Sequence, residues 1–365
     1  MRSFPFVFYK GYHISIPSFS KVAKGLDIVH IQSPALMGDM GVAVSRKQKI
    51  PCVMTYHTPP DQYLIQILPV PNSLVQESLK VFYYKYEKAL LRRCTMITAP
   101  SQIIIDLLKK RWGAMLPKAV SFSNGIDTEY FKETDPAKFK KDYNVPKGKV
   151  IGYTGRHSTE KHLEDLINLA DSFDGTVLIG GDGQQHEEFV KLAKGKKNVK
   201  FIGFFPRERL CEFYSSLDAF VMPSTAETEG LVVLEANACG TPAVGADAMA
   251  LKVTVQDGVN GYHYKPGDIK DLAAVVEKTV KEKGKLKASC RKFVEGRSSA
   301  SAAKRLVELY EEALIIYKKA QKEKKPSLME EVMEEVREKL NLGAANKSKG
   351  RRYIVSANKP KGGLR

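Results

Sequence analysis

Residues 223–242 read PSTAETEGLVVLEANACGTP, and this stretch carries the most information about the chain. Two glutamates eight positions apart, Glu227 and Glu235, enclose a glycine and an apolar run. The pattern predicts a strand that ends at Met222, then a loop, then a helix from near Gly230 to Gly240. Backbone N–H groups at a helix start attract anions and hydroxyl oxygens. We therefore expect both carboxylates to face one ligand cleft.

A second polar motif follows the apolar run at 150–154, which is typical of a buried strand. Residues 155–161 read GRHSTEK and place Arg156 and Lys161 on one turn that leads into a helix. An arginine fork combined with a lysine point charge suits a diphosphate. After the next predicted strand, residues 180–183 read GGDG, a turn at which the backbone must approach a ligand or another loop.

Short apolar runs alternate with helical stretches along the whole chain. The first series has predicted strands at 26–31, 51–56, 96–99 and 120–122, with helices at 35–47, 80–93 and 102–111. The polar stretch 128–148 is typical of a linker. The second series has strands at 150–154, 176–179, 199–203 and 219–222, with helices at 162–171, 186–194 and 207–217. Such alternation predicts an α/β protein with two doubly wound, Rossmann-like domains that face a cleft.

In their order along the chain, these motifs resemble the E-x7-E signature and the G-R-x(3)-E-K stretch of the retaining glycosyltransferases of family 4, which have the GT-B fold. The resemblance covers roughly residues 26–317, with NGID at 124–127 and DGVNG at 257–261. It implies that Glu235 binds ribose hydroxyls and that Glu227 meets the transferred sugar. It also implies that Arg156 and Lys161 neutralise the leaving diphosphate. The implied donor-binding residues are Arg156, Lys161, Gly183, Glu227, Gly230, Leu231 and Glu235.

The implied catalytic residues are His57, Arg156, Lys161 and Glu227, with His57 facing the donor sugar from the first domain. The resemblance implies four segments: an acceptor-side domain (1–130), a nucleotide-sugar domain (131–300), a helix that crosses back (301–320, predicted over 301–319) and a basic tail (321–365). We expect the tail to be disordered apart from a short acidic helix at 328–340. The family's first strand and glycine-rich turn have no room before residue 26. We therefore expect an incomplete first domain, through a late start or a shortened protein.

The net charge of +17 is unevenly distributed. Residues 1–130 hold 16 Lys and Arg against 8 Asp and Glu, which indicates an acidic partner or merely solubility. Residues 57–64, HTPPDQYL, resemble a stretch of members that glycosylate diacylglycerol-type lipids. The helix predicted from Lys80 mixes Phe82 and three tyrosines with lysines and arginines. Such a helix suits an anionic membrane surface, unless its aromatic side chains pack into the core.

The sequence thus predicts a retaining glycosyltransferase that moves a hexose from a UDP- or GDP-sugar to an acceptor hydroxyl, preferentially on a membrane lipid. The prediction includes no cofactor and no metal. The alternatives are a soluble sugar or sugar-phosphate glycosyltransferase, a non-catalytic nucleotide-sugar-binding protein and an epimerase, whereas nucleic-acid binding is not favoured. Five scattered cysteines and no apolar run of about 18 residues predict a cytoplasmic protein that can lie on the inner face of the membrane. The donor nucleotide, the sugar and the oligomeric state stay open.

Overall fold

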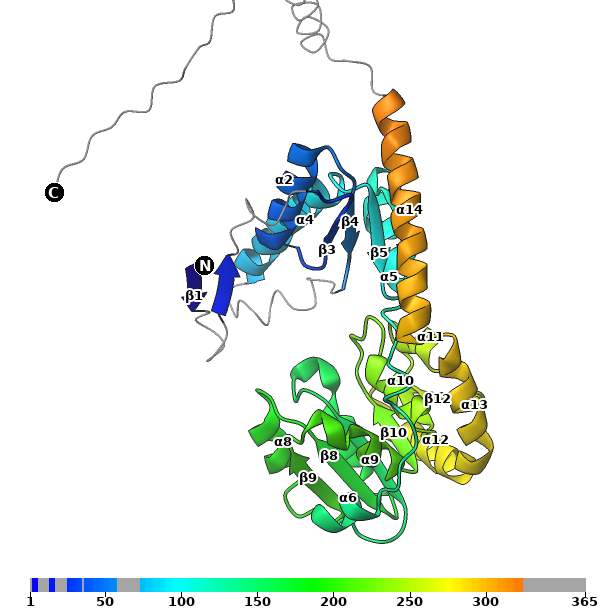
Figure 1. Cartoon of the computed structure of the whole chain (residues 1–365). Helices are drawn as coiled ribbons and strands as arrows, with labels where there is room; N and C mark the ends of the chain where they lie inside the picture. Colours follow the sequence, from blue (N-terminus) through cyan, green and yellow to red (C-terminus); the bar gives the residue numbers. More distant parts are fainter. Residues whose placement is uncertain (1, 6–12, 17–24, 35, 58–72, 324–365) are drawn as a thin grey trace, which may run out of the picture. The chain divides into compact units, whose positions relative to one another are not determined.

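The computed structural model of the protein describes residues 2–5, 13–16, 25–34, 36–57 and 73–323. These residues form two parallel sheets, each with its own helices and core, and one antiparallel hairpin (Figure 1). The prediction of two Rossmann-like α/β domains is confirmed. The hairpin pairs β1 (Arg2–Pro5) with β2 (His13–Ile16), and the sequence did not predict it.

The first sheet has four parallel strands in the order β3-β4-β5-β6. They are β3 (Val29–Ile31), β4 (Cys52–Thr55), β5 (Met96–Ala99) and β6 (Lys118–Ser121). Every residue of β4 and β5 is buried, because helices cover both faces of a parallel sheet. The helices are α2 (Leu36–Gln48), α4 (Ser73–Leu91) and α5 (Gln102–Trp112), followed by the short η2 (Gly113–Met115). All four predicted strands and three predicted helices are present, although α4 begins seven residues earlier than predicted.

The second sheet has six parallel strands in the order β12-β11-β10-β7-β8-β9. They are β7 (Val150–Thr154), β8 (Thr176–Gly180), β9 (Val199–Gly203), β10 (Ala219–Met222), β11 (Ala243–Ala246) and β12 (Gly261–Tyr264). Their helices are η3 (Thr159–Lys161), α7 (Leu163–Leu169), α8 (His186–Leu192), η4 (Arg207–Arg209), α9 (Leu210–Ser215), α10 (Leu231–Ala238), α11 (Leu251–Thr254), α12 (Ile269–Lys281) and α13 (Lys283–Glu295) (Figure 1). Strands β7 to β10 match their predicted ranges closely. The sequence patterns used above did not predict β11 and β12.

The interpretation of residues 128–148 as a linker is wrong. This stretch contains a helix, α6 (Ala137–Asp142), and the side chain of Phe139 within it is fully buried. The Phe139 ring packs at 4.5 Å from that of Tyr143 and at 5.8 Å from that of Phe205. Phe131 of the same stretch is buried in the same core too. Buried rings attach the segment to the core, because burying one large ring contributes roughly 1.5–3 kcal/mol.

The chain between the two sheets joins the second domain early. Ile126 forms a parallel bridge with Ser298 and belongs to the second domain's core. Helix α14 (Ser299–Glu323), the last one within the described residues, contains the predicted helix at 301–319. Leu309 on α14 packs with Val53 of β4 and with neighbouring apolar residues of the first sheet.

Three predictions concern residues outside those that the structure describes. They are the segment at 58–64 that resembles lipid-modifying members, the acidic helix at 328–340 and the basic end of the chain. Among the residues that are described, every helix falls short of the length and apolar character that crossing a bilayer requires.

Candidate functional site

Two loops from neighbouring strands form the centre of the candidate site. Residues 155–162, here called the β7 loop, follow strand β7, and residues 223–230, the β10 loop, follow strand β10. Strands β7 and β10 lie side by side in the sheet although about 70 residues separate them in sequence. The strand order reverses at this point. In open α/β sheets, such a reversal opens a crevice beyond the carboxyl ends of the strands.

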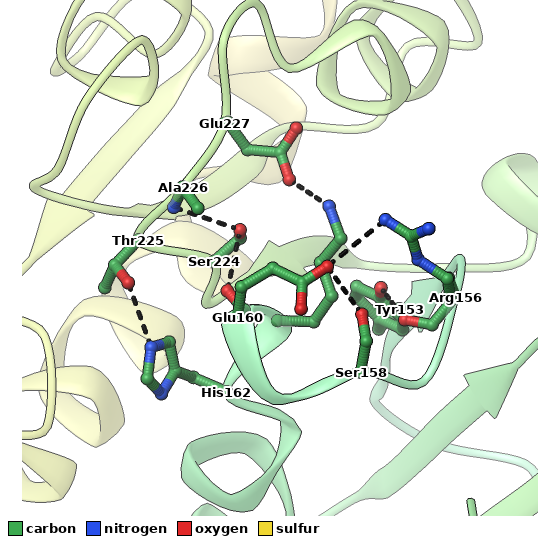
Figure 2. A network of polar contacts seen from close by, with 10 residues as sticks. Tyr153, Arg156, Ser158, Glu160, His162, Ser224, Thr225, Ala226 and Glu227 are labelled. Atoms are coloured by element: carbon green, nitrogen blue, oxygen red, sulfur yellow. Dashed lines mark hydrogen bonds and ion pairs between the residues drawn. The ribbon is translucent and has the colours of Figure 1, made fainter. Parts of the chain in front are cut away.

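Polar contacts fasten the two loops to each other (Figure 2). The ammonium group of Lys161 forms a close ion pair with the carboxylate of Glu227, and both side chains are only 14% exposed. The Ser224 hydroxyl donates a hydrogen bond of 3.0 Å to the backbone carbonyl of Glu160. The structure therefore brings the predicted cation of one motif directly onto the predicted carboxylate of the other.

Arg156, the second predicted cation, points from the β7 loop with its side chain 54% exposed. One guanidinium nitrogen lies 3.2 Å from the Glu160 carboxylate, which also accepts a bond of 2.7 Å from the Ser158 hydroxyl (Figure 2). Burial alone would raise the pKa of Glu160. The Ser158 bond and the positive charges of Arg156 and Lys161 outweigh burial and hold the pKa of Glu160 below its ordinary value. Glu160 is thus ionised and orients Arg156.

Most of the predicted residues line one cavity of about 450 Å³, called here the first cavity. Its lining comprises His57, Asn124, Tyr153, Thr154, Gly155, Arg156, Lys161, Met222, Glu227, Thr228, Glu229, Gly230, Leu231 and Val232. Gly230 precedes α10 with a φ of 80°, a left-handed conformation that favours glycine. The backbone therefore turns sharply there, and the start of α10 faces the cavity.

A second cavity of about 410 Å³ adjoins the first, and Thr154, Gly155 and Arg156 line both. Its other walls are Gly181, Asp182, Phe204, Phe205, Arg207 and Leu210. Phe204 is the most exposed large apolar side chain of the described residues, at 85%. An exposed aromatic ring beside an arginine offers a stacking surface for a planar ligand.

Glu235 lies on α10 and is not among the described residues that line either cavity. Its carboxylate accepts a hydrogen bond of 2.7 Å from the buried Tyr214 hydroxyl. Burial raises the pKa of Glu235, while the Tyr214 bond and the charge of Arg207 offset part of that rise. Arg207, whose charge acts on the Glu235 carboxylate, lines the second cavity. Its contact with a ribose stays a prediction.

His57 follows strand β4, and its Nε2 atom lies 2.7 Å from the side-chain oxygen of Gln32. Burial lowers the pKa of His57 below its ordinary value, so the ring is neutral near pH 7. The neutral imidazole lines the first cavity. A role for His57 next to a donor sugar stays a prediction.

The turn at 180–183 approaches another loop, which was one of its two predicted uses. Gly181 has a φ of 104°, and a Cβ atom there would lie 1.9 Å from the carbonyl oxygen of Gly155. A Cβ on Gly183 would lie 2.3 Å from the carbonyl oxygen of His157. The glycines thus let the turn pack against the β7 loop and support Arg156. A direct donor contact of Gly183 stays a prediction.

Three residues of the site were missed at the level of sequence. Arg207 and Phe204 follow strand β9, so the rule that ligands lie beyond strand ends could have located them. Glu229 is 6% exposed and hydrogen-bonded to Ser123 and Asn124, more than 100 residues earlier. No local pattern could have revealed that long-range contact.

Family comparisons agree with this geometry. Residues 135–297 match the family described as Glycosyl transferases group 1, and residues 1–130 match Glycosyltransferase Family 4. Among curated proteins, the chain is 29% identical to a sulfoquinovosyl transferase of Arabidopsis thaliana, over 74% of this chain and 54% of that protein. It is 27% identical to an alpha-monoglucosyldiacylglycerol synthase of Acholeplasma laidlawii, over 67% and 64% of the two chains. The chain thus spans less than two thirds of the length of these two relatives.

Solved structures show the fold. The chain matches HepE of Anabaena, solved in complex with UDP and glucose, with a TM-score of 0.65 and 22% identity over 78% of each chain. It matches a sucrose-phosphate synthase of Thermosynechococcus elongatus with the same TM-score and identity, over 79% and 74% of the two chains. The two Rossmann-like domains therefore have the GT-B fold.

Proposed function

We propose that the protein transfers a hexose from a nucleotide-diphosphate sugar to an acceptor hydroxyl, because residues 135–297 match the family Glycosyl transferases group 1 and residues 1–130 match Glycosyltransferase Family 4. The observation that carries this proposal is the junction of Arg156, Lys161 and Glu227 at one cavity. Two cations suit a diphosphate, and a carboxylate beside them suits sugar hydroxyls.

The charges of the site match the charge that develops in such a reaction. As the bond between the sugar C1 atom and the diphosphate oxygen breaks, negative charge grows on the phosphate. Arg156 and Lys161 lie where they would stabilise that charge, because preorganised cations act on the transition state without reorganising. We infer that the acceptor oxygen attacks C1 from the same face and that its proton passes to the leaving phosphate. Trapping a glycosyl group on any side chain would contradict this route.

We propose that the second cavity holds the base of the donor. Its exposed Phe204 ring and Arg207 line this cavity together with Arg156. We propose that Glu235, whose carboxylate interacts electrostatically with Arg207 of this cavity, binds the ribose between the base and the diphosphate. A donor with UDP or GDP is therefore proposed, and no residue yet chooses between them. The proposed reaction needs no cofactor and no metal.

Calorimetric titration with UDP-glucose and with GDP-mannose tests the donor site. We expect one of them to bind, and Glu235→Ala to weaken that binding by about tenfold or more, since lost hydrogen bonds to a carboxylate cost roughly 1.5–3 kcal/mol. Glu277→Ala removes an exposed carboxylate that pairs with Lys149 at 2.9 Å, and it should bind like the parent protein. Equal affinity of Glu235→Ala and the parent would contradict the assignment of Glu235.

For the acceptor we propose a membrane lipid. Two of the relatives are named alpha-monoglucosyldiacylglycerol synthase, enzymes whose product is a glycolipid. Helix α4 supports the proposal because some of its aromatic side chains pack against the domain, whereas one faces outward. Tyr84 packs near Trp112 with ring centroids 6.2 Å apart, and Tyr86 donates a bond of 3.0 Å to Asp39. Phe82 instead is 73% exposed.

The outward face of α4 combines that ring with basic groups. Val81 and Phe82 are exposed, Lys85 is exposed one helical turn after them, and the exposed Arg92 follows the end of α4. Apolar side chains can enter the headgroup boundary while neighbouring cations meet anionic lipids, each contributing about 1 kcal/mol. A soluble sugar or sugar-phosphate acceptor is the alternative, and it would give this face no ligand.

Cosedimentation with vesicles distinguishes the two acceptor classes. We expect binding to vesicles of phosphatidylglycerol and phosphatidylcholine, with weaker binding to phosphatidylcholine alone. Phe82→Asp should lower the partition coefficient by about tenfold or more, because a buried phenylalanine contributes roughly 1.5–3 kcal/mol. Val307→Asp is the matched control, since Val307 is 55% exposed on α14. Absence of vesicle binding by the parent protein would favour a soluble acceptor.

A further inference from the structure

Glu229 occupies an unusual position for a carboxylate, since only 6% of it is exposed. One carboxylate oxygen accepts bonds of 2.6 Å from the Ser123 hydroxyl and 2.9 Å from the Asn124 backbone N–H. The other oxygen accepts a bond of 2.5 Å from the Asn124 side-chain amide. Its backbone carbonyl accepts a further bond of 2.5 Å from the Thr254 hydroxyl. Both ends of the residue are therefore fixed.

The carboxylate is retained at a cost. Burial raises the pKa of Glu229, and the hydrogen bonds from Ser123 and Asn124 offset part of that rise. These donors are neutral, so they compensate the buried charge less well than a cation would. A side chain that is costly to bury, with three donors from two consecutive residues aimed at it, serves for more than filling space.

The contact joins two functional parts of the chain. Ser123 and Asn124 lie just after β6, on the connector between the two sheets, whose next residues join the second domain at Ile126. Glu229 lies within the β10 loop, two residues after Glu227. Asn124 and Glu229 both line the first cavity. A displacement of the connector would therefore act directly on the loop that carries Glu227.

We infer that Glu229 is a positioning residue, whose carboxylate fixes the β10 loop to the connector and so keeps Glu227 beside Lys161. The inference rests on the proposed function, because it assigns Glu229 a part in transferring the donor's sugar. The β7 loop, which carries Arg156 and Lys161, is also held from the other side, where the His157 N–H donates a bond of 2.9 Å to the Asp182 carbonyl and the His157 carbonyl accepts one of 3.1 Å from the Gln185 N–H. Loss of the Glu229 contact should thus disturb sugar transfer more than diphosphate binding.

Glu229→Ala should lower kcat/KM for the donor by roughly 10- to 100-fold, the effect of losing the partner of several buried donors. The dissociation constants of UDP and GDP should change by less than about threefold. Glu229→Gln should recover most of the activity, because its amide oxygen can accept from Ser123 and the Asn124 amide can turn to accept from its NH2 group. Ser123→Ala, which removes one donor of three, should give an intermediate loss.

Hydrogen exchange measured by mass spectrometry on the full chain tests the contact of Glu229 with Ser123 and Asn124 independently of any enzymatic activity. We expect Glu229→Ala to speed exchange at both 122–126 and 225–231, and Glu229→Gln and Glu277→Ala to leave both segments as in the parent. Unchanged exchange at either segment in Glu229→Ala would overturn the inference. So would an equal loss of UDP or GDP affinity and of transfer. The parent protein could bind neither nucleotide while Glu229→Ala still speeds exchange at both segments. In that case the proposed function fails, but the coupling of the connector to the β10 loop is supported.

Discussion

Replacing Lys161 by methionine is expected to lower the rate of donor cleavage by about two to three orders of magnitude, the usual cost of removing one preorganised group that stabilises developing negative charge. The ammonium group faces Glu227 at the first cavity, and its side chain is only 14% exposed. Shielding from water increases the energy of its interaction with a phosphate. Methionine keeps most of the aliphatic length of lysine, so the decrease in rate can be attributed to the loss of the ammonium charge.

The measurement is hydrolysis of the donor that calorimetry identifies, assayed without acceptor so that the acceptor's identity does not enter. Lys149→Met is the control, because Lys149 lies in the same domain with its side chain 42% exposed. Hydrolysis by the parent protein should be unchanged by a chelator of divalent cations. A loss of less than about threefold in Lys161→Met would remove Lys161 from the proposed mechanism.

Replacing Gly181 by alanine is expected to lower the free energy of unfolding by about 3–5 kcal/mol, at the upper end for single substitutions. Two effects combine at this residue. Its φ of 104° is one that L-residues rarely adopt, and the new Cβ would lie 1.9 Å from the Gly155 carbonyl oxygen. The obstacle is backbone rather than a flexible side chain, so the turn and the β7 loop must separate.

Urea denaturation followed by far-ultraviolet circular dichroism measures this loss. Gly195→Ala provides a matched control, because Gly195 has a φ of 90° but open space where its Cβ would lie. It should cost only about 1–2 kcal/mol, the penalty of the left-handed conformation alone. Similar losses in the two variants would mean that the turn at 180–183 does not press on the β7 loop as described.

The alternation of apolar runs and helices predicted the two domains, since buried parallel strands such as β5 and β10 are continuous apolar segments. It failed at 128–148, where the buried Phe131 and Phe139 lie among lysines and prolines rather than in a continuous apolar run. It also did not give strand order. The adjacency of β7 and β10, which brings Lys161 to Glu227, follows from the crossover between the two halves of the sheet.

The residues of the candidate site likewise fall into those that the sequence could predict and those that it could not. Arg156, Lys161 and Glu227 could be predicted because each lies just beyond a strand end within a dense local motif. Glu229 could not, because its partners Ser123 and Asn124 are brought to it only by tertiary folding. Long-range contacts of this kind leave no trace in the spacing of residues.

The ion pair between Lys161 and Glu227 has a consequence for selectivity. Lys161 already has Glu227 as its counter-ion, so a lone anion such as inorganic phosphate must compete with a carboxylate. On the proposed function, a sugar donor avoids this competition, because its diphosphate takes Lys161 while its hydroxyls take Glu227. Binding then becomes an exchange of partners that only a two-part ligand completes, and we expect inorganic phosphate to be a poor inhibitor of the proposed reaction.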